Sequence, residues 1–431
     1  MPADLASKLR QWNAAGRPRT PAARPPRRGI ETVVDGQFVS TLHGECFLVE
    51  RRYPAHTEQG ALALNTALRL SERARHLLTR GQATAALDPT KALFLDTETT
   101  GLAGGTGTYA FLIGAGYFDG DAFCLRQYFM RHPGEEPALL AALADLLAAF
   151  PLWVTFNGKT FDVPLLETRF LLTRRERLPP PAHHLDLLHP ARRLWRTRLP
   201  SCALGSLERL LLGVQRGDDV PAWTIPTLYF DYVRRGRCEP LRGVFAHNAD
   251  DLLSLVALLG LFGQILDTPA QHAHRVDAVA LLRLFTQAGL AAEAAAWCSA
   301  SLERVPPVER RGLLWEMSVL LRRAGDRDGA ARLWQQLAQE SGPWALAAQV
   351  ELAKHHEHHR RDYLAATRAT EAALAALAVA RWPVPPTQRH ELERRLGRLH
   401  FRMQHQRTPI GQERTEPAGL VCAPPQAEFA S

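Results

Sequence analysis

The sequence predicts an α/β domain, a mixed sheet flanked by helices, followed by an all-α domain of helical repeats. Within residues 91–267, β-rich apolar runs alternate with amphipathic helical patterns. Within residues 275–402, alanine, leucine and arginine dominate and strand signals vanish. That second region also shows weak self-similarity at roughly 34–37 residues, a period typical of stacked helix-turn-helix units.

Composition narrows the class of protein. The chain has 431 residues and a net charge of +8. Its apolar runs stay below the ~18 residues of a membrane span, and its first residues lack the apolar core of a secretion signal. The six cysteines are scattered without a CxxC pair, which favours neither a zinc site nor disulfides. We therefore expect a cytoplasmic protein without a membrane partner, whose basic balance suits a polyanion.

The N-terminal ninety residues divide into two parts. Residues 1–40 are rich in arginine, proline and alanine, which predicts a disordered basic tail. Residues 41–90 contain a strand pattern (GECFLVERRY) and a helix-like stretch from Gly60 to Arg80. We expect this part to be an N-terminal extension packed on the next domain.

The α/β domain, residues 91–267, opens with the strand ALFLDTET. Two more strands, YAFLIGAGYF and AFCLRQYFM, flank the turn Asp119-Gly120. The later elements, in order, are a helix EEPALLAALADLLAAF, a buried strand LWVTFN, a helix from Val163 to about Leu172, helices HHLDLLHPARRLW and SLERLLLGV, a connection 215–242, and a helix Asn248–Leu266.

The region 275–402 contains three similar stretches, LLRLFTQAGLAAEAAAW, LLRRAGDRDGAARLW and HHRRDYLAATRA. They predict a repeat domain of tetratricopeptide type; an irregular helical bundle is the alternative. Because repeat arrays present a surface, a protein partner is plausible. Residues 406–431 again read as a tail.

Two acids end the first strand of the α/β domain. Asp96 and Glu98 are two residues apart, so their carboxylates face the same side and can share a metal ion. Thr99, Gly101 and Leu102 form a tight exit whose backbone can reach a nucleotide. An acidic strand end exposed to water is the structural alternative.

Asp162 follows the next buried strand at the start of a helix. A helix N-cap explains an aspartate there, although a cap can also present its second oxygen to a metal. Asn157 can hydrogen-bond a sugar or phosphate, and Lys159 can offset phosphate charge. For Asp186, in HHLDLL, the pattern favours a helix cap; an acid that supports the metal ligands from behind is the alternative.

His247 and Asp251 lie four residues apart on the last helix of the domain, hence on one face. There Asp251 can hold a metal while His247 accepts a proton from water. A helix start enriched in acids is the alternative.

Together these patterns resemble the DEDD superfamily of 3′–5′ exonucleases, which have a ribonuclease-H-like fold. Four stretches, LFLDTETTGLAGGTGTYAFLIG, FNGKTFDVPLL, LDLLHPARRLWR and FAHNADDLLSL, resemble the bacterial YprB-type ribonuclease-H-like family over roughly residues 40–267. The resemblance implies that Asp96, Glu98, Asp162 and Asp251 hold two Mg²⁺ or Mn²⁺ ions and that His247 is the general base. Histidine-type members usually have four residues between the histidine and the last aspartate; here there are three, as in tyrosine-type members.

We therefore expect a metal-dependent nuclease, a 3′–5′ exonuclease acting on DNA or RNA by a two-metal mechanism. The alternative is a non-catalytic nucleic-acid-binding module whose helical repeats dock a protein. The complete set of four carboxylates favours the enzyme, because a pure binder does not need it.

Overall fold

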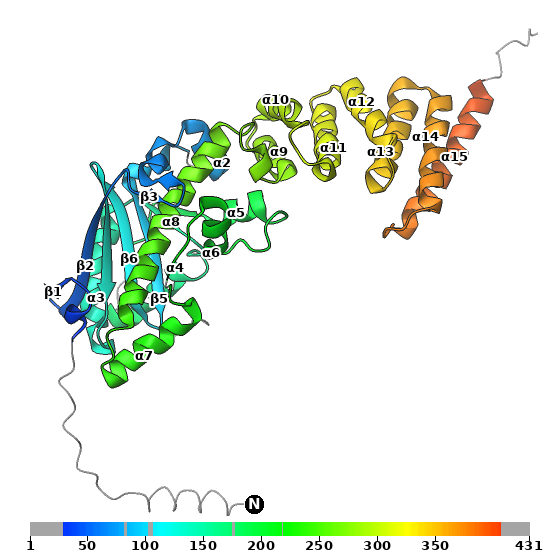
Figure 1. The fold of residues 1–431 in the computed structure, drawn as a ribbon. Coiled ribbons are helices and arrows are strands. Elements are labelled where there is room, and N and C mark those ends of the chain that lie inside the picture. The colour runs from blue at the N-terminus through cyan, green and yellow to red at the C-terminus, as the bar shows by residue number, and fades with distance from the viewer. Residues whose placement is uncertain (1–28, 82–83, 102–106, 175–176, 218, 407–431) are drawn as a thin grey trace, which may run out of the picture. The chain divides into compact units, whose positions relative to one another are not determined.

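A computed structural model describes residues 29–81, 84–101, 107–174, 177–217 and 219–406. It confirms the predicted fold class, a mixed sheet flanked by helices and then an all-α region (Figure 1). The chain divides into two compact units between Val305 and Pro306. The first unit contains the sheet.

The sheet has seven strands in the order β1-β2-β7-β6-β5-β8-β9. Neighbours from β1 to β5 are antiparallel, whereas β5, β8 and β9 are parallel. The strands are β1 (Gln37–Thr41), β2 (Gly44–Pro54), β5 (Ala92–Thr99), β6 (Ala110–Asp119), β7 (Ala122–Phe129), β8 (Leu152–Thr155) and β9 (His183–Asp186). A separate two-stranded sheet joins β3 (Glu58–Gln59) to β4 (Leu62–Ala63). Strand β5 joins the antiparallel part of the main sheet to its parallel part, because it pairs with β6 on one side and with β8 on the other. Its C-terminal end therefore lies between these two parts.

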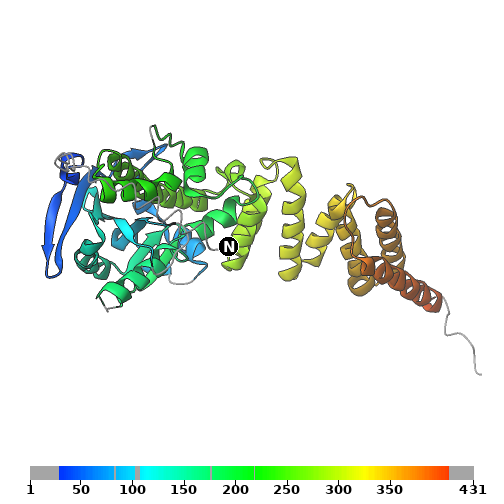
Figure 2. The same ribbon diagram turned by 90° about the horizontal axis from the view of Figure 1, so that it is seen from below.

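The region expected as an extension supplies strand β2 of the main sheet, and the end of the segment expected as a tail supplies the edge strand β1. Strand β2 pairs with β7 along its length, from Phe47 to Pro54. Strand β1 begins at Gln37, inside the segment expected as a tail, because a hairpin returns it onto β2 (Figure 2). Gly44, with φ of 113°, adopts the conformation that this turn needs.

Two helices, α3 (Glu136–Ala149) and α8 (Leu241–Asp267), cover opposite faces of the sheet (Figures 1 and 2). Helix α8 packs on β5 and β6. At Gly114 of β6 a Cβ atom would lie 2.3 Å from the Asn248 Oδ1 atom, so glycine allows this close approach. Among the described helices α8 alone has the length and apolarity of a membrane span, but 83% of that stretch is buried within the protein. It is thus placed as a core helix.

The other helices of the first unit surround these layers. They are α2 (Glu72–Thr79), α4 (Asp162–Arg169), α5 (Leu188–Trp195), α6 (Leu204–Leu207), α7 (Ile225–Arg235), α9 (Ala278–Gln287) and α10 (Ala291–Ser301), with the single-turn or irregular segments η1 (Ile30–Thr32), η2 (Leu64–Arg69), η3 (Thr84–Ala86), η4 (Pro89–Lys91), η5 (Pro133–Glu135), η6 (Phe170–Arg174), η7 (Glu208–Leu212), η8 (Ala222–Thr224) and η9 (Ala273–Arg275).

Two segments differ from the elements expected. The residues HHLD form the edge strand β9 rather than a helix, because they pair in parallel with β8. The expected connection 215–242 contains helix α7, which is anchored by Tyr229. Its ring stacks on that of Phe111 with centroids 4.1 Å apart. Tertiary pairing and stacking therefore decide both segments.

Between residues 306 and 406 the second unit contains helices and no strand, and its successive helices pack on one another. They are α11 (Pro307–Arg323), α12 (Arg327–Ala338), α13 (Pro343–His355), η10 (His356–Arg360), α14 (Tyr363–Ala378) and α15 (Pro386–Gln406). In both views the helices follow chain order from yellow to red (Figures 1 and 2). The tetratricopeptide type and the protein partner stay predictions.

Candidate active site

The end of strand β5 presents acids on one side and a threonine on the other. Asp96 and Glu98 share one side, and Thr97 between them points to the opposite side. The Thr97 hydroxyl donates a hydrogen bond of 2.5 Å to Oδ1 of Asp162, the buried first residue of α4. Asp162 is thus held beside β5 on the threonine side, while its charge still reaches Asp96 and Glu98 and raises the pKa of both.

Helix α8 fixes the orientation of Asp96 through a buried amide relay. The Asn248 side-chain nitrogen donates to Asp96 Oδ2 at 2.8 Å. The Gln127 side chain on β7 donates in turn to Asn248 Oδ1 at 2.9 Å and to the Phe245 carbonyl at 2.8 Å. Because Gln127 and Asn248 are fully buried and fixed by these bonds, Asp96 has little freedom to turn away.

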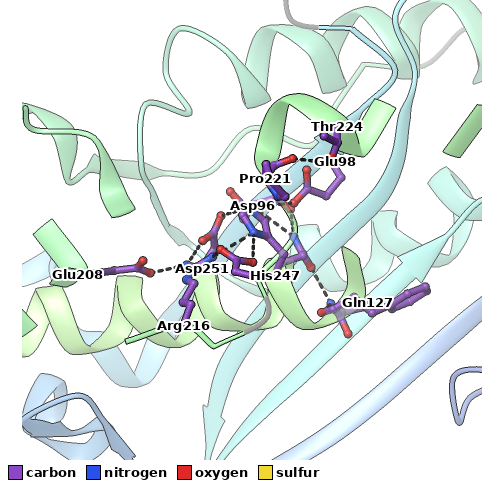
Figure 3. Close-up of polar contacts among 12 residues, drawn as sticks. Asp96, Glu98, Gln127, Glu208, Arg216, Pro221, Thr224, His247 and Asp251 are labelled. Atoms are coloured by element: carbon purple, nitrogen blue, oxygen red, sulfur yellow. Dashed lines mark hydrogen bonds and ion pairs between the residues drawn. The ribbon is translucent and has the colours of Figure 1, made fainter. Parts of the chain in front are cut away.

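The same helix brings His247 and Asp251 against Glu98 (Figure 3). One potential ligand atom from each of these residues lies within 4.8 Å of the other two. His247 Nε2 is 3.6 Å from Asp251 Oδ2 and 4.0 Å from Glu98 Oε1. The carboxylate oxygens of Glu98 and Asp251 are donors that suit Mg²⁺ or Mn²⁺, and the imidazole of His247 adds a nitrogen. The three residues therefore form a candidate cation site, with Asp96 beside them.

A fourth group, Asp219, holds the other side of the imidazole. Its Oδ1 atom is 2.8 Å from Nδ1 of His247. Arg216 Nη1, which only donates, also lies 3.2 Å from Nδ1. We assign the Nδ1 proton from the shorter contact, because an ionised carboxylate only accepts hydrogen bonds, and Nε2 is then the basic nitrogen. Burial lowers the pKa of His247, but Asp251, Asp219 and Glu98 together raise it above its ordinary value.

Burial and mutual repulsion raise the pKa values of the acids. Burial, then the charges of Asp251, Glu98 and Asp162, raises the pKa of Asp96 well above its usual range, although the hydrogen bond from Asn248 opposes the rise. Burial raises the pKa of Glu98 to about 7, against the lowering effect of His247. Burial likewise raises that of Asp162 to about 6. The cluster therefore holds more negative charge than the protein compensates, and a cation would relieve it.

The cation that the chain itself supplies is Arg216, from the loop before α7. Its Nη2 atom donates to Glu208 Oε1 at 2.5 Å and also to Oδ1 of Asp251, and its Nη1 atom lies 3.4 Å from Asp219 Oδ2. Only 11% of its side chain is exposed. Sequence reasoning missed Arg216, Glu208, Asp219 and Asn248. The one signal for Asn248 was its place between His247 and Asp251 on a predicted helix.

The expected substrate contacts divide between two cavities. Asn157, in the left-handed conformation with φ of 66°, lines a cavity of about 460 Å³ together with Asp96 and Asp251. Lys159 lines a different cavity, of about 300 Å³. The Thr99 hydroxyl donates to the Gly101 carbonyl at 2.8 Å and closes the strand exit. The expected contact Leu102 lies outside the described residues.

Asp186 has the structural role expected for it. Its carboxylate accepts hydrogen bonds from the backbone N–H groups of Asn157, Lys159 and Leu188, at 2.8, 3.1 and 3.0 Å. It caps the start of α5 and fixes the turn after β8, which positions Asn157.

Comparison with known proteins agrees with this geometry. The ribonuclease H superfamily model matches residues 93–262, from strand β5 into helix α8. Uncharacterized protein YprB of Bacillus subtilis (strain 168) is 33% identical over 289 residues, which cover 66% of this chain and 69% of that protein. The chain belongs to the YprB-type family of ribonuclease-H-like proteins. This YprB-type chain therefore has a nuclease-type fold, and the superfamily implies nucleic acid as its substrate.

Proposed function

We propose that this YprB-type protein is a metal-dependent 3′–5′ exonuclease that hydrolyses phosphodiester bonds of DNA or RNA. The observation that carries the proposal is the half-buried cluster of acids at the end of β5. Glu98, His247 and Asp251 present potential ligand atoms within 4.8 Å of one another, and Asp96 lies half-buried beside them and raises their mutual repulsion. Such a cluster is costly to bury and is typical of a cation site in a catalytic centre.

In this proposal Asp96, Glu98 and Asp251 hold the ions directly, because their oxygens are hard donors of the kind that Mg²⁺ and Mn²⁺ prefer. Bound ions at such a site polarise the phosphodiester group and lower the pKa of water. Asn248 keeps Asp96 turned toward the site through its 2.8 Å hydrogen bond. Asp162 is held by Thr97 on the other side of the strand, and its charge adds to the negative potential at Asp96 and Glu98.

His247 accepts the proton of the attacking water at Nε2 in this proposal. Asp219 fixes the tautomer and the ring orientation through Nδ1, as a carboxylate does for a catalytic imidazole. The three-residue spacing between His247 and Asp251 places both on one face of α8, with 3.6 Å between Nε2 and Oδ2. The short spacing is thus compatible with a histidine base.

The test is cleavage of end-labelled oligonucleotides by the full chain, with and without Mn²⁺. Single- and double-stranded DNA and RNA are compared, each labelled at the 5′ or at the 3′ end. We expect metal-dependent release of mononucleotides from the 3′ end, and no cleavage by a matched Asp96→Asn protein. Binding without cleavage under all conditions would contradict the proposal and support a non-catalytic nucleic-acid-binding module.

A further inference from the structure

The C-terminal end of helix α5 presents two arginines beside the carboxylate cluster, Arg192 in its last turn and Arg196 at its C-cap. The cavity that contains Asp96 and Asp251, of about 460 Å³, is also lined by Arg192. A second cavity, of about 400 Å³, is lined by Arg192 and Arg196. The two cavities share Arg192, Ser201 and Cys202, so they adjoin. One path therefore leads from the half-buried acids Asp96 and Asp251 at one end to guanidinium groups at the other.

The charges of Arg192 and Arg196 are exposed and lack a partner within the described structure. Both side chains are exposed, and neither makes an ion pair or a side-chain hydrogen bond with a described residue. Both guanidinium groups lie close enough to Cys202 to lower the pKa of its thiol, against the larger raising effect of burial. Both charges therefore act on the same stretch of the path.

Helix geometry sets the direction of these two side chains. Residues four apart share one face of an α-helix, with a rise of about 6 Å between them. Arg192 and the C-cap residue Arg196 form such a pair, because Arg196 keeps helical backbone angles and its N–H donates to the Arg192 carbonyl. Arg193, one residue further round, lines the other cavity with Lys159 and His189. The pair is thus directed to the path from the carboxylates.

We propose that Arg192 and Arg196 bind successive backbone phosphates of a single nucleic-acid strand whose scissile phosphate lies at Asp96 and Asp251. This rests on the proposed nuclease function, and it names the part of the substrate that the chain holds. Carboxylates repel the rest of a phosphodiester chain, so a strand needs cations directly beyond the cleavage position. One helical turn is comparable with the distance between phosphates of an extended strand.

The size of the path favours a single strand over a duplex. Each cavity falls within the range that encloses a small ligand rather than a macromolecule. Phe156 and Leu188 line the first cavity, and Leu199 and Pro200 line the second. Such apolar groups offer contact to sugars and bases without selecting a sequence. We therefore expect binding that depends on salt more than on sequence.

The test measures how salt weakens binding of a fluorescent single-stranded oligonucleotide to the full chain, with Ca²⁺ in place of Mg²⁺ to prevent turnover. The change is the double variant Arg192→Gln/Arg196→Gln. Each lost phosphate contact on a single strand lowers the slope of log K against log salt by about 0.7, so we expect a decrease of about 1.4 and roughly tenfold weaker binding at low salt.

Two controls separate local charge from folding and from net charge. Arg192→Lys/Arg196→Lys keeps both charges and should retain the wild-type slope. Arg52→Gln/Arg69→Gln removes the same charge from exposed positions that line neither cavity, and should change the slope little. Thermal melting checks that all three proteins are folded.

The outcomes are distinct. An unchanged slope in the Gln variant, or an equal decrease in the Arg52/Arg69 control, would overturn the assignment of these two arginines while wild-type cleavage of nucleic acid leaves the nuclease proposal standing. A wild-type protein that neither binds nor cleaves any strand would overturn both.

Discussion

Each of the two units buries a cluster of charged side chains, and the two clusters have opposite balances. In the first unit several carboxylates surround one guanidinium group, that of Arg216. In the second unit a single carboxylate, that of Glu357, is paired with three arginines. The side chain of Glu357 is completely buried, and these pairs connect η10 to α15.

The pKa values show what the difference means. Burial raises the pKa of Glu357, but its hydrogen bond from Arg398 and the charge of Arg395 outweigh burial and lower it below the ordinary value. Burial raises the pKa of Glu98 to about 7, because the neighbouring His247 and Arg216 only partly offset burial and the nearby acids. Burial is common to both glutamates. Only Glu98 belongs to a cluster whose negative charge is not fully compensated. This difference in charge balance distinguishes the candidate catalytic cluster from the structural one.

The largest expected effect is on catalysis by the first cluster. Asp96→Asn or Glu98→Gln should lower kcat by roughly 10²–10⁴, because bound ions supply several kcal/mol of transition-state stabilisation. Folding should survive, since neutralising one of several crowded acids relieves repulsion. The end-label assay and a thermal melt measure both. Full activity in either variant, with contaminating nuclease excluded, would contradict the catalytic role of the first cluster.

His247 should come next. His247→Ala should lower kcat by ~10²–10⁴ if Nε2 is the base. Because the pKa of His247 is raised, the wild-type rate should increase with pH through a value above the ordinary histidine pKa, and the variant should lose that step. The pH profile of kcat checks this. A loss below tenfold would reduce His247 to a positioning role.

The second cluster should respond in stability rather than in catalysis. Glu357→Gln removes the common partner of three arginines and should lower the free energy of unfolding of the second unit by about 2–3 kcal/mol. Arg398 and Arg402 are partly exposed and can turn to water, which limits the cost. Chemical denaturation measures the loss, and kcat on a short oligonucleotide should not change. A catalytic defect without destabilisation would break the distinction between the clusters.

Arg216 offers a sharper test of charge balance. Its guanidinium group is hydrogen-bonded to Asp251, so it competes with a cation for that carboxylate. Arg216→Gln should therefore tighten Mn²⁺ binding about tenfold in calorimetric titration, as expected for removing one nearby positive charge. Arg69→Gln is the matched control. Unchanged or weaker Mn²⁺ binding would show that Arg216 supports the site instead.

The smallest expected effect is a pH dependence of stability without metal. The folded-state pKa of Glu98 is about 7, above its ordinary 4.5. The folded state therefore holds an extra proton between these values, and stability contributed by Glu98 is lost as pH rises through about 7. In EDTA, Glu98→Gln should be more stable than wild type at pH ~8 and nearly equal to it at pH ~5. A constant difference between the two melting temperatures across this range would count against the raised pKa.

The fold and the acids were predictable because each rests on local pattern. Strand period two places Asp96 and Glu98 on one side, and helix period places His247 above Asp251. Arg216 was not predictable, because it comes from a loop with no periodic pattern and meets its partners only through tertiary structure. Strand β9 was missed for a similar reason: its pairing with β8 outweighs a helical pattern in the residues that follow it.

The central claim is that the uncompensated acids at the end of β5 form a divalent-cation site. The most direct measurement is anomalous scattering from crystals of the full chain grown with Mn²⁺. We predict two anomalous peaks ~3.5–4 Å apart beside Asp96, Glu98 and Asp251, with Arg216 turned away from Asp251. No peak at these carboxylates at saturating Mn²⁺, with Arg216 still paired to Asp251, would contradict it.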